Sequence, residues 1–458
     1  MQPTDSPTAF ERTRNWLNNS ITLRLLVIGL LILIMLIPVN MVESLIRERQ
    51  YRQTEAQDEI SLKWGYPQTI GGLLLSVPYT VYNTVKREDK EEVFTSTAFH
   101  HFLPEELVIS GDIDPEVRYR GIFETTVYAS QLSLSGHFNL PREIEISDKR
   151  LRWNEAVVSF GISDLRSIRE SVALNWDEKV IDFNPGLPSS DVLESGINAE
   201  VDIIWDEDEH DLKIPFSVEL DIRGSEYLHF LPLGKTTDVS ISSDWNAPAF
   251  GGAFLPASRD ITDKGFEASW RVLNLNRTYP QQFKGSAAGI ADSAFGVTLM
   301  FPVDHYQKST RAAKYAVLFI TLTFVVFFFI QIMAKVRIHP IQYLLVGFAL
   351  CLFYTLLIAV AEHIRFGWSY LIAAMSTVSL IVFYAHGTFK KAKLTAVLAA
   401  ILTLLYGYIF SIIQLHDFAL LAGSIGLFFA LSVLMYVTRK IDWYNSGEFT
   451  SKRRVTED

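Results

Sequence analysis

The sequence predicts an α-helical integral membrane protein with six transmembrane helices, one near the N-terminus and five near the C-terminus, and a large exported, mainly antiparallel β domain. Three observations lead to this fold class. Six apolar runs are long enough to cross a bilayer, five of them lie almost end to end, and an acidic block of 269 residues precedes these five. The chain has 458 residues, of which 20% are charged, whereas a soluble domain usually has about 25%.

Each apolar run has close to the 20 or so residues that a helix needs to span the hydrocarbon core. One such run would also fit a buried helix of a large soluble protein, but five consecutive runs joined by a few residues would not. We therefore expect transmembrane helices two to six within residues 312–438. The six predicted spans are Leu25–Val42, Tyr315–Ala334, Ile341–Ala361, Trp368–Phe389, Leu394–Leu415 and Phe418–Val437.

The first span, residues 25–42, is predicted to be an uncleaved signal anchor after a cytoplasmic N-terminus at residues 1–24. Basic residues precede it, as they would a signal peptide, but no small-residue cleavage pattern follows it. Two acid–base pairs at i and i+4, beginning at Glu43 and Glu48, then favour continued helix. Because no Gly or Pro occurs from Met41 to Lys63, we expect a polar helical stalk beyond the span.

The distribution of Lys and Arg predicts that both termini are cytoplasmic, because short cytoplasmic loops carry an excess of these residues. The segments on this side hold Lys335, Arg337, Lys390, Lys391, Lys393, Arg439, Lys440, Lys452, Arg453 and Arg454. The short loops on the opposite side hold only Arg365. We therefore expect a multi-pass protein with a cytoplasmic tail at residues 439–458 and the acidic block in the periplasm.

The exported block, residues 43–311, is predicted to be mainly β after its helical stalk. Apolar and polar residues alternate in Gln131–Ser135, Ser217–Arg223 and Val239–Ser242, which is typical of half-buried antiparallel strands. The block has 26 Lys and Arg against 43 Asp and Glu, a balance of −17, while the rest of the chain has 15 against 8. The single cysteine, Cys351, lies outside the block, so the fold of the block must depend on its own core.

The sequence contains no familiar catalytic or cofactor-binding pattern, and we predict no catalytic residue, no cofactor and no metal site. The HExxH, GxGxxG and GxSxG motifs do not occur. The acidic run Asp206–Asp211 lacks the spaced ligands and the glycine of a calcium loop, so an exposed hairpin tip is the simpler interpretation. The formal net charge of −10 argues against a nucleic-acid partner, since nucleic-acid-binding domains are usually basic.

Nine ionisable residues are predicted to lie at one level, the outer boundary of the membrane, where the second, third and fifth spans meet water. Charged groups collect at the edge of the hydrocarbon, and this is sufficient to explain the cluster. The alternative is a polar groove that holds a lipid headgroup, a peptide or a proton. The nine residues are Asp304, His305, Arg311, Lys314, Glu362, His363, Arg365, His416 and Asp417.

Several unusual segments occur in a set order along the chain. They are Phe99–Glu105, Trp245–Pro256, Arg311–Tyr315, His339–Gly347, Glu362–His363 and Ile441–Tyr444. Together they resemble the CreD family of bacterial inner-membrane proteins, and the resemblance covers essentially the whole chain. It implies a Gram-negative inner membrane, a role in cell-envelope integrity and a link to envelope-stress signalling, and it implies no catalytic residue.

The leading functional hypothesis is a non-enzymatic membrane protein whose exported domain binds or monitors an envelope component. Two alternatives stay open. One is a transporter of a lipid or small amphiphile through a groove at the outer boundary. The other is an envelope enzyme that uses Glu362, His363, His416 or Asp417 as acid and base. Expected partners are membrane lipids and an envelope component or peptide. Small residues such as Ala422 and Gly426 also allow packing into a homo-oligomer.

Overall fold

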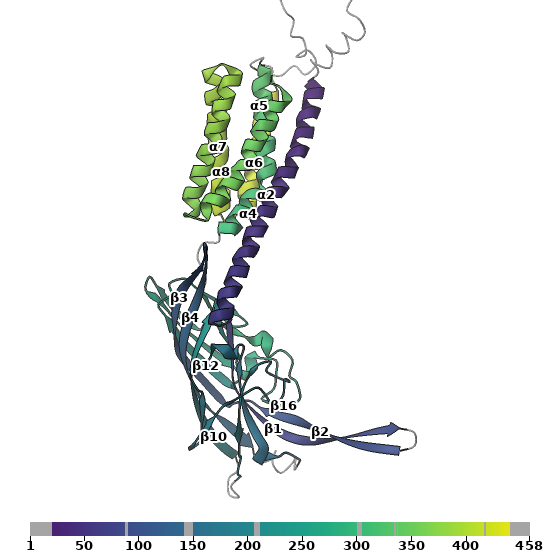
Figure 1. The fold of residues 1–458 in the computed structure, drawn as a ribbon, viewed down its shortest axis with the longest axis vertical. Helices are drawn as coiled ribbons and strands as arrows, with labels where there is room; N and C mark the ends of the chain where they lie inside the picture. Colours follow the sequence, from purple (N-terminus) through teal and green to yellow (C-terminus); the bar gives the residue numbers. More distant parts are fainter. Residues whose placement is uncertain are drawn as a thin grey trace, which may run out of the picture. The chain divides into compact units, whose positions relative to one another are not determined.

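The chain divides into two compact units, one helical and one built from β-sheets (Figure 1). Unit 1 contains Met1–Arg52 and Asp304–Asp458, and unit 2 contains Gln53–Val303. The computed structural model describes residues 21–87, 90–141, 150–205, 211–299, 305–333, 336, 338–415 and 418–439. The acidic run at residues 206–210 lies outside these ranges.

Unit 2 contains two mixed sheets in which most neighbouring strands are antiparallel. In the described residues, only β1 with β11 and β3 with β12 pair in parallel. The nine-stranded sheet has the order β13 (Pro248–Gly252), β17 (Phe295–Leu299), β11 (Tyr227–Phe230), β1 (Gln68–Arg87), β5 (Ala156–Ile162), β9 (Gly196–Val201) and β8 (Asn184–Pro185), with β2 (Lys90–Phe102) beside β1 and β16 (Gln282–Lys284) beside β2. The eight-stranded sheet has the order β14 (Ser258–Thr262), β15 (Gly265–Leu273), β12 (Thr236–Ser243), β3 (Glu106–Arg120), β4 (Phe123–Pro141), β10 (Asp211–Ser225), β6 (Ala173–Trp176) and β7 (Lys179–Asp182).

The predicted alternation of buried and exposed residues is confirmed in β4, β10 and β12. In β10, Phe216, Val218, Leu220 and Ile222 are buried, while the residues between them are exposed or half-buried. Side chains from both sheets form one continuous hydrophobic core. Unit 2 is therefore a single packed domain, because each sheet buries its apolar face against the other.

The helix α2 runs without interruption over Ile21–Trp64 and belongs to both units, because the division between them falls after Arg52. The expected polar helical stalk after the first span is thus confirmed as a helix. The two predicted acid–base pairs form, with 3.7 Å between Glu43 and Arg47 and 2.7 Å between Glu48 and Arg52. Such exposed pairs stabilise a helix by only about 0.3–0.5 kcal/mol each.

The end of α2 is fixed within unit 2 by Trp64. Its indole N–H donates to the carbonyl oxygen of Tyr128 at 3.1 Å, and two guanidinium groups lie close to its ring. Arg118 is 4.7 Å and Arg223 is 4.5 Å from the ring centroid. These cation–π contacts hold the last turn of α2 over strands β3 and β10.

The remaining helices lie close to the predicted spans. They are α4 (His305–Lys314), α5 (Ala316–Met333), α6 (Pro340–Ala361), α7 (Phe366–Phe389), α8 (Ala392–Gln414) and α9 (Ala419–Thr438). In the described residues, α2, α6, α7 and α8 are long and apolar enough to cross a membrane, and α4 with α5, which are bent by 44°, make up a fifth candidate. The apolar part of α9 that the structure describes, Leu421–Tyr436, is shorter. The sixth span therefore stays a prediction.

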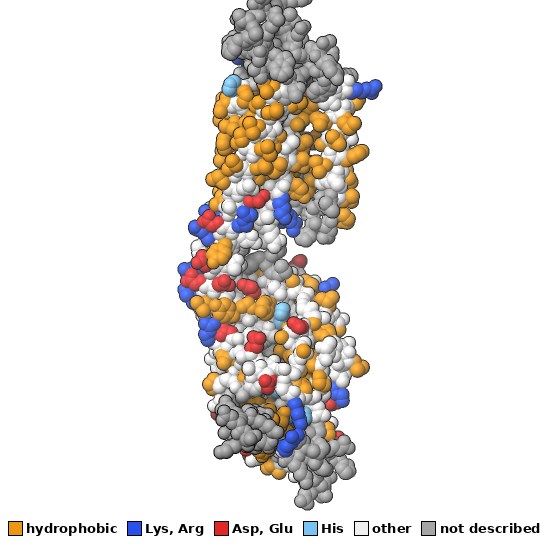
Figure 2. Space-filling model, turned by 90° about the vertical axis from the view of Figure 1, so that its right-hand side faces the viewer, with side chains coloured by type: hydrophobic (Ala, Val, Ile, Leu, Met, Phe, Trp, Pro, Cys, Tyr) orange, Lys and Arg blue, Asp and Glu red, His pale blue; other side chains and the backbone are white. Residues whose placement is uncertain are grey.

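The surface of unit 1 has the composition expected of helices in lipid. On the face shown in Figure 2, hydrophobic side chains cover the helices and the charged side chains lie toward their ends. Leu352, Trp368, Phe383, Leu404 and Phe428 are each more than half exposed. An apolar surface of this extent is rare on soluble monomers, which supports a membrane location for these helices.

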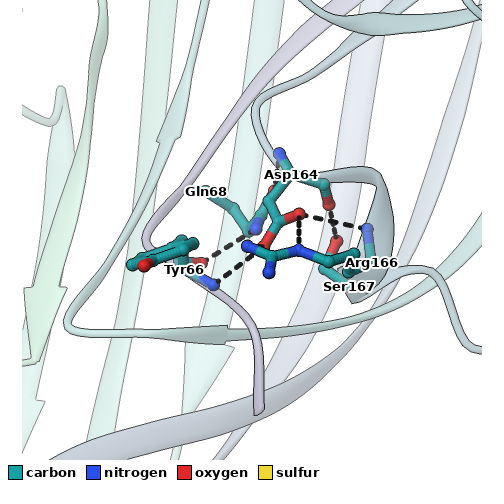
Figure 3. A network of polar contacts seen from close by, with 5 residues as sticks. All are labelled: Tyr66, Gln68, Asp164, Arg166 and Ser167. Atoms are coloured by element: carbon teal, nitrogen blue, oxygen red, sulfur yellow. Dashed lines mark hydrogen bonds and ion pairs between the residues drawn. The ribbon is translucent and has the colours of Figure 1, made fainter. Parts of the chain in front are cut away.

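A polar network holds the start of β1 against the loop after β5 (Figure 3). The carboxylate of Asp164 accepts the backbone N–H of Tyr66 at 3.3 Å and the backbone N–H and Nε of Arg166 at 3.1 and 2.9 Å. Gln68 donates to the carbonyl oxygen of Tyr66 at 2.8 Å, and the Ser167 hydroxyl donates to that of Asp164 at 2.6 Å. Burial opposes the ionisation of Asp164, but the hydrogen bonds from Arg166 and Tyr66 lower its pKa below the ordinary value.

The substitution Asp164→Ala is expected to lower the free energy of unfolding of unit 2 by about 1–3 kcal/mol at pH 7, because two backbone donors lose their acceptor. The folded-state pKa lies below the unfolded value of ~3.9, so the carboxylate stabilises the fold above that pH. This contribution disappears as the pH falls through the folded-state pKa. Denaturant titrations at pH 7 and pH 3, with the exposed Asp182→Ala as control, measure the difference. A loss that is equal at both pH values would contradict the ionic role.

Candidate functional site

The structure describes six of the nine predicted boundary residues. His305, Arg311 and Lys314 lie on α4, Glu362 follows α6 directly, and His363 and Arg365 lie in the turn before α7. The other three predicted residues, Asp304, His416 and Asp417, lie outside the described residues.

Glu362 is the centre of the polar contacts in this part of unit 1. The hydroxyl of Tyr306 on α4 donates to Oε1 of Glu362 at 3.0 Å, and Nε of Arg49 on α2 lies 3.7 Å from the same oxygen. The side chain of Glu362 is 11% exposed, while that of Arg49 is 37% exposed. The contact is therefore a half-buried ion pair supported by a neutral donor, and it joins three helices at one carboxylate.

Local sequence explains how each of these side chains reaches the contact. The backbone N–H of Glu362 bonds to Ile358 at 3.1 Å, so its side chain continues the last turn of α6. On α4, Tyr306 is buried together with Ser309, Ala312 and Ala313, and spacings of three and four residues place these four on one face. Small side chains on that face let α4 lie close to α6, which directs the Tyr306 hydroxyl toward Glu362.

Three of the other predicted residues that the structure describes lie outside this contact. His363, Arg365 and Lys314 are exposed, and none of these three forms an ion pair with another residue that the structure describes. Lys308, which the sequence analysis did not select, lies 5.7 Å from the ring of Phe366 at the start of α7. Sequence reasoning thus identified Glu362 but missed both of its partners, Arg49 and Tyr306.

The geometry of the contact places Glu362 at a junction between three helices. Both of its donors bind the same oxygen, and the adjacent His363 is exposed. Across the described ranges, no group of three or more His, Cys, Asp or Glu side chains is arranged to hold a metal ion. What the contact can do is hold α2, α4 and α6 in one arrangement and release them when Glu362 loses a partner.

The start of α6 forms a reciprocal cap. His339 Nδ1 accepts the backbone N–H of Ile341 at 3.3 Å, and Oε1 of Gln342 accepts the backbone N–H of His339 at 2.9 Å. Pro340 occupies the first helical position, where its missing N–H costs no hydrogen bond. The residue types of the His-Pro-Ile-Gln segment are therefore accounted for by this capping box, which is a structural role.

Comparison with known proteins gives one extensive match. The family model described as "Inner membrane protein CreD" matches residues 20–444. The Inner membrane protein CreD of Escherichia coli (strain K12) is 31% identical over 431 residues, which cover 93% of this chain and 95% of that protein.

The likeness to two solved structures is weak. Two crystal structures of the M1 zinc metallopeptidase from Deinococcus radiodurans, one of them of a mutant, superpose with a TM-score of 0.19 at 7% sequence identity. The superposition covers 43% of this chain and 42% of that enzyme, and a likeness this low carries no argument. By the family model and the 31% identity, the chain belongs to the CreD family of inner membrane proteins.

Proposed function

We propose that the protein is a non-enzymatic, multi-pass protein of the bacterial inner membrane that supports the integrity of the cell envelope. Its six spans place both termini in the cytoplasm and unit 2 in the periplasm, where unit 2 binds or monitors an envelope component. The excess of Lys and Arg in the predicted cytoplasmic segments supports this orientation. The name of the Escherichia coli relative supports the location.

The observation that carries the monitoring role is the contact at Glu362. The chain passes from unit 1 to unit 2 after Arg52 and returns at Asp304. Arg49 lies three residues before the first crossing and Tyr306 two residues after the second, and both bind the same carboxylate. A force on either connection therefore changes the bonds of Glu362, which gives α6 a means of responding to events in unit 2.

The charge of unit 2 favours a cationic or divalent-bridged ligand. Residues 53–303 contain 21 Lys and Arg against 40 Asp and Glu, a balance of −19. Such a domain repels bare anionic lipid surfaces within a Debye length of about 8 Å at physiological salt. Capture of envelope material by the full-length protein in detergent should accordingly weaken as the salt concentration rises.

Cysteine labelling tests the orientation on which this proposal depends. In a Cys351→Ser background, one variant carries Ser258→Cys on the exposed strand β14 and another carries Lys391→Cys between α7 and α8. We expect a membrane-impermeant maleimide to label Ser258→Cys in spheroplasts, and to label Lys391→Cys only after the membrane is permeabilised. Labelling of Lys391→Cys in intact spheroplasts, with Ser258→Cys protected, would overturn the orientation and the periplasmic role together.

A further inference from the structure

We propose that a groove between α7 and α8 binds one phospholipid, with an acyl chain along the groove and the phosphate group at Arg365. The inference goes beyond the proposed function. It requires only that α7 and α8 cross the membrane, and it does not depend on what unit 2 binds.

The groove has a volume of about 870 Å³ and a mostly apolar lining. Its lining includes small residues from both helices, among them Ala374 on α7 and Gly407 on α8. Apart from the backbone of α8 around it, no atom lies within 4 Å of a Cβ built on Gly407, so this position faces open space. Trp368 and Met375 line the groove and are more than half exposed, as expected of side chains in contact with lipid.

One buried polar group beside the groove, the hydroxyl of Tyr370, already has a partner. The hydroxyl of Tyr370 donates to the carbonyl oxygen of Tyr406 at 2.7 Å, and both side chains are buried. An extended peptide in the groove would leave many of its backbone groups without hydrogen bonds, which costs free energy. An acyl chain has no such groups, and the apolar lining therefore selects it.

The length of the groove along α7 fits a lipid that occupies one leaflet of the bilayer. The lining residues of α7 extend from Arg365 to Ser379, which is about 21 Å at a rise of 1.5 Å per residue. Half of a bilayer core is about 15 Å thick. A chain that begins at Arg365 can therefore remain in the groove through its whole leaflet.

The charge at one end of the groove identifies the headgroup. Arg365 is exposed and forms no ion pair with another described residue, so its guanidinium is available for a bidentate phosphate contact. Gly367, two residues after Arg365, also lines the groove, and no atom obstructs its Cβ position. A cation at the end of an apolar slot is complementary to a phosphate ester with a hydrocarbon tail.

Photo-crosslinking of the full-length protein in dodecyl maltoside micelles, which contain no phosphate ester, tests the proposal. The probes are phosphatidylglycerol and diacylglycerol with the same photoactivatable acyl chain, each at low mole fraction. We expect phosphatidylglycerol to label peptides of α7 and α8 about tenfold more than diacylglycerol, a ratio that corresponds to ~1.4 kcal/mol. Excess unlabelled phosphatidylglycerol should compete on the wild-type protein, and excess unlabelled diacylglycerol should not.

Two variants and two matched controls assign the effect to the groove. Gly407→Leu fills the groove and improves helix propensity, so labelling by both probes should fall without unfolding. Arg365→Gln should lower phosphatidylglycerol labelling about tenfold and leave diacylglycerol labelling unchanged. The controls are Gly387→Leu, an open position of α7 outside the lining, and Lys391→Gln, which caps α8 as Arg365 caps α7. Equal labelling by both probes, or unchanged labelling in either variant, would overturn the proposal.

Discussion

The substitution Glu362→Arg is expected to abolish complementation of a deletion strain under envelope stress and to destabilise unit 1. It places a second guanidinium beside Arg49 and removes the acceptor of the Tyr306 hydroxyl. Because the side chain of Arg49 is 37% exposed, solvent screens part of the repulsion. We therefore expect a loss of about 1–3 kcal/mol, measured as a shift in thermal unfolding of the purified protein.

A charge exchange separates a specific contact from general damage. The double variant Arg49→Glu with Glu362→Arg restores an ion pair of opposite polarity, and a tyrosine hydroxyl accepts a hydrogen bond as readily as it donates one. It should recover most of the lost stability and complementation. Glu48→Arg, beside Arg52 on the exposed face of α2, is the matched control and should complement normally.

The result for Glu362→Arg tests the monitoring role separately from the membrane orientation. If the Glu362→Arg variant is inserted, folds and complements fully, the carboxylate does not link the two connections between unit 1 and unit 2. This conclusion holds whatever orientation the labelling of Ser258→Cys shows. If neither variant complements but both are stable, the function requires the carboxylate itself and the mechanical interpretation is wrong.

The sequence predicted the features that depend on neighbours along the chain. Alternation in Ser217–Arg223 and apolar length in Ile341–Ala361 are local patterns, and they appear as β10 and α6. The bend of 44° between α4 and α5 is not marked by Gly or Pro at Tyr315. It depends on how these helices pack, and an apolar run carries no information about packing.

The contacts of the candidate site also could not be predicted from local sequence patterns. Glu362 was recognisable because it ends an apolar run at the predicted outer boundary of the membrane, where charged groups collect. Arg49 and Tyr306 come from opposite parts of the sequence, and only folding brings them to one oxygen. A signal for each was present: Arg49 is one of three arginines after the first span, and Tyr306 is adjacent to His305. Neither feature of the sequence indicates that the residue contacts Glu362.

The substitution Trp270→Ala is expected to lower the free energy of unfolding of unit 2 by about 3–5 kcal/mol, as is usual when a large aromatic residue is removed from a core. Trp270 on β15 is 2% exposed. Its ring centroid lies 5.7 Å from that of Phe250 on β13 and 5.8 Å from that of Phe295 on β17. β15 belongs to one sheet and the other two strands to the second, so the indole joins the two sheets.

Hydrogen exchange on the full-length protein measures this loss and locates it. Amides of β13, β15 and β17 should exchange faster in Trp270→Ala, because the cavity removes contacts from both sheets at once. Trp270→Phe should lose less than half as much, since it keeps an aromatic ring and removes an indole N–H that has no hydrogen-bond partner among the described residues. Leu275→Ala, at an 87% exposed position nearby, should change stability by less than about 0.5 kcal/mol. A loss below ~1 kcal/mol for Trp270→Ala, or faster exchange in β15 alone, would show that the two sheets do not depend on a shared core at this point.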